Sequence, residues 1–188
     1  MERFDELLGI ATENITADFI RFPIDGGDRE LFTYRERVYC YELYHQLRID
    51  WDDYSDGYQV SGEVDKGGHP ILRRRGIRSG IPDLLVHLPG LDGMSFNYAV
   101  IEVKGPRVKD PGIKADLIKL DRFVRLADYQ RAIFLVYASG RGRNDEWVQR
   151  VNRITGEAGI ETPIEIWLHP EPYTKAVRAF PPIPARPL

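Results

Sequence analysis

Three charged residues in the middle of the chain are spaced so that they could act together. Asp83 follows a proline at the start of one apolar segment, IPDLLVH, and Glu102 and Lys104 lie in the next, AVIEVKG. Alternate residues of a strand share a face, so Glu102 and Lys104 point the same way while Val103 points into the opposite packing layer. If the two strands are neighbours, Asp83 meets Glu102 and Lys104 at one end of the sheet.

Two carboxylates and an ammonium in one place suit hydrolysis assisted by a divalent metal ion. Hard anionic oxygens plus water favour Mg²⁺ or Mn²⁺, and the lysine can orient an attacking water or help to deprotonate it. Cys40 is the only cysteine, and no paired histidines give a zinc-ligand spacing. The simplest alternative is an ion pair between Glu102 and Lys104 on an edge strand, which the apolar neighbours of these residues disfavour.

The elements that must position these residues follow from periodicity. Helical spacing of apolar residues predicts helices, and short apolar or alternating runs predict strands. The order from residue 31 onward is α-β-β-β-α-β-α-β, preceded by an N-terminal helix at 2–14. The predicted ranges are a helix at 31–48, strands at 58–64, 82–88 and 98–103, a helix at 113–129, a strand at 132–138, a helix at 146–155 and a strand at 163–168.

Pro82-Asp83, eighteen further residues and then Glu102-Val103-Lys104 resemble the signature of the PD-(D/E)XK nuclease superfamily. The resemblance implies an α/β fold with a restriction endonuclease-like core (α-β-β-β-α-β), in which helices flank a mixed central sheet. The N-terminal helix and the C-terminal helix and strand would be additions to that core. It also implies that Asp83, Glu102 and the carbonyl of Val103 bind the metal, while Lys104 positions the water.

The family often adds a glutamate from the first helix, and two residues could supply it. Glu36 shares a helical face with the apolar residues that should pack on the sheet. However, the sequence Thr33-Tyr34-Arg35-Glu36 also has the pattern of a capping box, in which Glu36 would bond the backbone at a helix start. Glu42 is the rival, although periodicity rotates it by about 120° from that face.

Other residues are weaker candidates for the site. An arginine-rich loop just before Pro82 should lie near the catalytic edge and could bind DNA phosphates through Arg73, Arg74, Arg75 and Arg78. Glu63 and His87 could lie in a second shell around the metal. Lysines and aspartates alternate in the helix at 113–129, among them Asp116 and Lys119, which is typical of a solvent-exposed helix face.

The whole chain of 188 residues, with a net charge of −3, fits one domain at 1–169 followed by a Pro-rich tail at 170–188. It has neither a long apolar run nor a basic leader, so we expect a cytoplasmic protein without a membrane partner.

The resemblance implies a magnesium-dependent endonuclease that hydrolyses phosphodiester bonds of DNA in defence, restriction or repair. It could act as a homodimer or with a partner protein. The alternative is a catalytically silent module of the same fold that binds nucleic acid or a protein.

Overall fold

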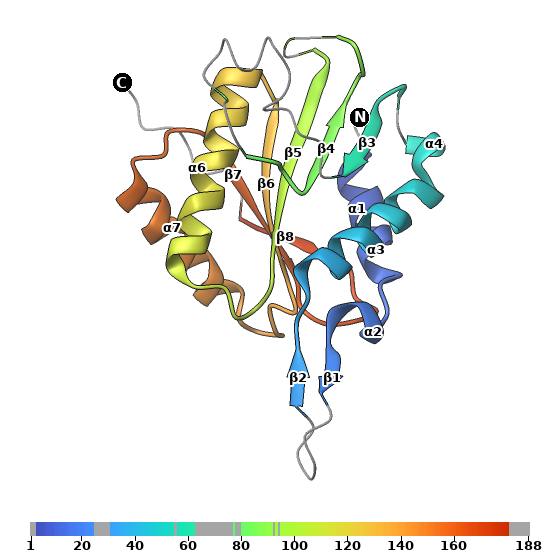
Figure 1. Cartoon of the computed structure of the whole chain (residues 1–188), viewed down its shortest axis with the longest axis vertical. Helices are drawn as coiled ribbons and strands as arrows, with labels where there is room; N and C mark the ends of the chain where they lie inside the picture. Colours follow the sequence, from blue (N-terminus) through green and yellow to red (C-terminus); the bar gives the residue numbers. More distant parts are fainter. Residues whose placement is uncertain are drawn as a thin grey trace.

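A mixed six-stranded sheet forms the centre of the molecule, and helices cover both of its faces (Figure 1). The computed structural model describes residues 3–24, 31–54, 56–62, 77, 80–91, 93 and 95–180. The α/β class and the mixed sheet flanked by helices are as predicted. None of the helices in these residues combines the length and the apolar character needed to cross a membrane.

The sheet has the strand order β3-β4-β5-β6-β7-β8. The first three strands form an antiparallel meander, the next two run parallel to β5, and β8 returns antiparallel to β7. Helix α6 joins β5 to β6, and α7 joins β6 to β7. The bounds are β3 Gln59–Gly62, β4 Leu84–His87, β5 Asn97–Lys104, α6 Asp110–Ala127, β6 Arg131–Tyr137, α7 Asn144–Ala158, β7 Ile164–His169 and β8 Val177–Phe180.

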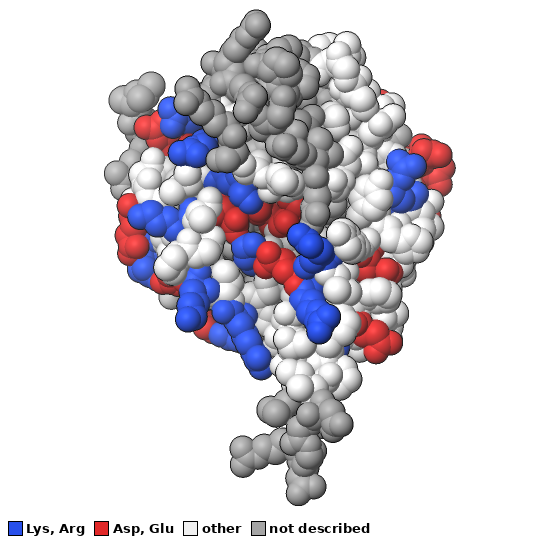
Figure 2. Space-filling model, viewed as in Figure 1, with Lys and Arg blue, Asp and Glu red and all other residues white. Residues whose placement is uncertain are grey.

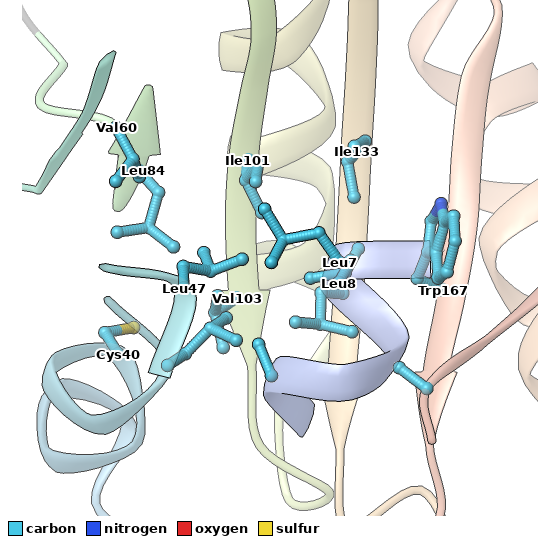
Figure 3. Close-up of a cluster of buried hydrophobic side chains, with 14 of the residues drawn as sticks. Leu7, Leu8, Cys40, Leu47, Val60, Leu84, Ile101, Val103, Ile133 and Trp167 are labelled. Atoms are coloured by element: carbon cyan, nitrogen blue, oxygen red, sulfur yellow. The ribbon is translucent and has the colours of Figure 1, made fainter. Parts of the chain in front are cut away.

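The sheet separates two apolar layers. On one side, Ile101 and Val103 pack with α1 (Phe4–Glu13) and α3 (Glu36–Ile49), where Leu7, Leu8 and Leu47 complete the layer (Figure 3). On the other side, the strands pack on α6 and α7. Since neighbouring residues of β5 face opposite layers, Glu102 lies on the side of α6.

The first half of the chain differs from the prediction in one respect that matters for the site. The predicted helix at 31–48 begins only at Glu36, because residues 31–33 form strand β2 (Leu31–Thr33) and pair with β1 (Phe22–Ile24). This small ribbon extends away from the main sheet (Figure 1). Two single-turn helices, α2 (Ala17–Ile20) and α4 (Trp51–Tyr54), were not predicted either.

Part of the segment that the sequence assigns to a Pro-rich tail belongs to the sheet. Residues 177–180 form β8, which pairs with β7 at the edge of the sheet. Ala179 packs against the layer formed by α6 and α7. The sheet therefore includes residues beyond 169, which the sequence assigns to the tail.

Candidate functional site

Asp83 and Glu102 come together because β4 and β5 pair in an antiparallel register. Leu84 lies opposite Ile101, so the residue before β4 meets the next residue of β5. The backbone N–H of Val103 donates a hydrogen bond of 2.7 Å to Oδ2 of Asp83. One carboxylate oxygen of Asp83 is therefore fixed against the end of β5.

Lys104 lies between two further carboxylates. Its Nζ donates a hydrogen bond of 2.6 Å to Oε1 of Glu36, the first residue of α3, and lies 3.1 Å from Oδ2 of Asp116 on α6. Because these carboxylates come from opposite sides of the sheet, the ammonium links α3 to α6 across the end of β5.

Glu102 is almost completely buried, with 1% of its surface exposed. Lys119, on α6, donates a hydrogen bond of 2.8 Å from Nζ to Oε2 of Glu102 and lies 3.4 Å from Oδ1 of Asp116. The other oxygen, Oε1, is buried and has no hydrogen-bond partner in the part of the chain that the structure describes. A buried carboxylate oxygen without a partner is costly, so it indicates an incomplete set of interactions.

We call these six side chains the charged cluster: Glu36, Asp83, Glu102, Lys104, Asp116 and Lys119. When all six are ionised, the carboxylates outnumber the ammonium groups by two. The excess is chemically expensive in a site that is largely removed from water. A single divalent cation would balance it.

The excess negative charge is reflected in the pKa values of the cluster. Burial raises the pKa of Glu102 well above its ordinary value, and the nearby Asp83 raises it further. Burial likewise raises the pKa of Asp83, against the hydrogen bond from Val103. Although burial acts to lower it, the pKa of Lys104 is raised, since Glu36 and Asp116 stabilise the ammonium form. Lys104 is therefore positively charged at neutral pH.

The side chains of the cluster do not form a complete metal-coordination site as they stand. Among the residues that the structure describes, no three His, Cys, Asp or Glu side chains are placed to coordinate one ion together. Ammonium groups lie between the carboxylates instead. Even so, the oxygen donors, the uncompensated charge and the unpartnered Oε1 of Glu102 fit an ion such as Mg²⁺ or Mn²⁺. Asp83 and Glu102 are the residues that could hold it.

The structure distinguishes between the two helix glutamates. Glu36 reaches the charged cluster, whereas Glu42 accepts a hydrogen bond of 2.6 Å from Gln46 one turn further along α3. The capping-box interpretation of Glu36 is wrong, because Thr33 belongs to β2 and no side chain caps the start of α3. The carboxylate of Glu36 is thus available to Lys104.

His87 is not brought to the cluster. It lies at the other end of β4 from Asp83, where its Nε2 is 3.3 Å from Oγ of Ser61. Some predicted site residues lie outside the described part of the chain. They are the four arginines expected to bind phosphates and the glutamate expected near the metal: Arg73, Arg74, Arg75, Arg78 and Glu63. Val103 contributes its N–H to Asp83, and its carbonyl as a metal ligand stays a prediction.

Asp116 and Lys119 are the members of the cluster that the sequence prediction missed. Asp116 is 6% exposed, although the alternation of charges around it suggested a solvated face. The helical spacing of the sequence could have predicted this burial. Asp116 is three residues after the buried Ile113 and four before the buried Leu120, so it lies on the apolar face of α6. A buried carboxylate on such a face requires a partner of opposite charge, and Asp116 has two, Lys104 and Lys119.

A pocket of about 350 Å³ adjoins the cluster, and Glu36 and Lys104 form part of its wall. The rest of the lining includes Tyr34, Arg107 and Tyr137. On this face of the molecule, acidic side chains gather near the middle and lysine and arginine side chains surround them (Figure 2). A polyanion approaching this face would meet both signs of charge.

No protein-family model, curated protein or solved structure matches the chain. Any function must therefore be inferred from the geometry and chemistry of the cluster and its surroundings.

Proposed function

We propose that this chain is a metal-dependent nuclease of the PD-(D/E)XK kind that hydrolyses phosphodiester bonds in DNA. The observation that carries the proposal is the convergence of Asp83, Glu102 and Lys104 where β4 begins and β5 ends, in a largely buried cluster of four carboxylates and two ammonium groups. The order α3-β3-β4-β5-α6-β6 supports a restriction endonuclease-like core, since it follows the α-β-β-β-α-β order of that family.

The residues would divide the chemistry as follows. Asp83 and Glu102 would hold a Mg²⁺ ion, which would supply positive charge for the phosphate and make water more acidic. Lys104 keeps its proton because Glu36 and Asp116 raise its pKa. It therefore acts as a hydrogen-bond donor through Nζ, orienting the water or a phosphate oxygen, and it does not serve as the base.

A cleavage assay tests this function. Purified protein with Mg²⁺ or Mn²⁺ is incubated with a plasmid, a single strand, a branched junction and a flap. We expect cleavage of at least one substrate, and a loss of about a hundredfold or more in Lys104→Ala, because removing one positioned donor has effects of that size. Lys109→Ala, an exposed lysine just before α6, is the matched control and should retain activity. If the wild-type protein leaves all four substrates intact, the nuclease proposal is wrong.

One observation favours a second candidate, a catalytically silent module of the same fold. Lys119 already pairs with Oε2 of Glu102 and so supplies part of the positive charge that a metal ion would bring. In that case the cluster is a set of internal ion pairs that stabilises the sheet end, and Lys104→Ala lowers stability without any activity to lose. Binding of Mn²⁺ by wild-type protein would count against this candidate.

A further inference from the structure

The pocket beside the cluster differs from the cluster in its chemistry. Tyr34, which follows β2, and Tyr137, at the end of β6, contribute aromatic surface, with ring centroids 6.4 Å apart. Glu36 and Lys104 form the wall toward the cluster. A ligand that fills the pocket therefore touches aromatic rings on one side and the side chains beside Asp83 and Glu102 on the other.

The back of the pocket is held rigidly. Tyr137 stacks on Tyr39 at 4.3 Å with an interplanar angle of 11°, and the hydroxyl of Tyr39 is 2.8 Å from Nδ1 of His169. Tyr137 is 1% exposed, yet it lines the pocket. The stacking of Tyr137 on Tyr39 therefore fixes this aromatic wall of the pocket.

Arg107 supplies a cation at the rim. Its guanidinium lies 5.2 Å from the centre of the Tyr34 ring and, among the residues that the structure describes, it forms no ion pair. A guanidinium over an aromatic ring keeps N–H groups with which it can bind a phosphate. Aromatic surface and an exposed guanidinium together are the features that recognise a nucleotide.

We propose that this pocket binds one unpaired nucleotide of the substrate strand, with its base against Tyr34 and Tyr137 and a phosphate on Arg107. The identity of the ligand rests on the proposed nuclease function. A volume of about 350 Å³ is at the small end of ligand sites and has room for one nucleotide, not for a paired base. Duplex DNA would have to release a base to fill it, so the enzyme prefers single strands, flaps or frayed ends.

The test measures the binding of full-length protein to a fluorescent oligothymidylate and to a duplex of the same length, both in EDTA. We expect the single strand to bind more tightly. Arg107→Gln and Tyr34→Leu should each weaken its binding roughly tenfold, the effect of losing a base–aromatic or phosphate contact. Tyr34→Phe keeps the ring and should bind like the wild type. Arg122→Gln, an exposed arginine on α6, should stay within about twofold of it.

The proposal is overturned if the duplex binds as tightly as the single strand, or if Arg107→Gln and Arg122→Gln bind alike. Thermal unfolding of Tyr34→Leu shows whether that variant is folded, and Arg107→Gln provides the decisive comparison if it is not. Because no metal is present, binding does not depend on cleavage. If the pocket variants weaken binding as expected but the wild type cleaves nothing in Mg²⁺, the pocket still binds a nucleotide and the nuclease proposal is wrong.

Discussion

At the scale of single residues, two buried glutamates, on the strands either side of β6, have opposite roles. Glu102 is 1% exposed, and burial raises its pKa well above the ordinary value. Glu165, on β7, is 5% exposed, but two hydrogen bonds from Arg131 overcome the effect of burial and lower its pKa. Glu165 therefore belongs to a satisfied structural ion pair, whereas Glu102 holds its charge at a cost to stability. Such a cost is expected at a functional site.

This contrast predicts opposite effects of two matched substitutions on metal-free protein. The folded state holds the proton of Glu102 more tightly than the unfolded chain does, so ionisation destabilises the fold at neutral pH. Glu102→Gln removes that cost and should raise the free energy of unfolding. Glu165→Gln should lower it. Urea denaturation in EDTA at about pH 7.5 measures both changes.

The gain from Glu102→Gln should also shrink as the pH falls. The wild-type carboxyl takes up its proton in the folded state once the pH falls below the raised folded-state pKa. The cost of burying it then shrinks, and it is gone only below the lower pKa of the unfolded chain. A gain that grows toward low pH, or a loss at neutral pH, would contradict this account of Glu102.

The residues of the cluster were predictable to different degrees. Asp83, Glu102 and Lys104 could be found because charges on apolar strands are conspicuous. The sequence left Glu36 and Glu42 as alternatives for the helix glutamate. Only the structure shows that α3 begins at Glu36 and brings this residue to the cluster. Asp116 was missed because positive and negative residues alternate around it, which suggested a solvent-exposed helix face. Its helical spacing nevertheless places it on the buried face of α6.

At the scale of elements, long periodic segments were predictable and short ones were not. The helices α6 and α7 and the strands β4 to β7 lie within a few residues of their predicted ranges. Strands β1, β2 and β8 have three or four residues each, too few for an alternating pattern to stand out. In addition, β8 precedes a Pro-rich stretch that dominated the interpretation of the C-terminal segment.

The junction after β5 connects the site to the pocket wall, and a side chain larger than that of glycine would be crowded there. A Cβ atom on Gly105 would lie 3.0 Å from the hydroxyl and 3.2 Å from Cζ of Tyr137, which is itself stacked on Tyr39. Gly105→Ala should therefore lower stability by about 1–3 kcal/mol, as overpacking does. Gly156 in α7 has no atom within 4 Å of such a Cβ, so Gly156→Ala should raise stability by about 0.5–1 kcal/mol. Thermal unfolding of both variants measures the difference; changes of the same sign would contradict this account of the junction.

At the scale of the whole molecule, the site is an assembly of distant segments. Glu36 comes from α3, Asp83 from the turn before β4, Glu102 and Lys104 from β5, and the pair of residues 116 and 119 from α6. The sheet therefore has to fold before any of the chemistry exists. The chain carries a net charge of −3, so affinity for a polyanion has to come from local cations and from a bound metal ion, not from the overall charge.

We propose that the charged cluster keeps its excess of carboxylates for a divalent cation. Calorimetric titration of the full-length protein with Mn²⁺ tests it most directly, using wild type, Glu102→Gln and, as a matched control, Glu42→Gln, since Glu42 lies outside the cluster. We predict a saturable site in the wild type and in Glu42→Gln, and a loss of about tenfold or more in affinity in Glu102→Gln, which lacks a ligand oxygen. If the wild type takes up no Mn²⁺, or if Glu102→Gln binds it equally well, the cluster is a set of internal ion pairs and the account is wrong.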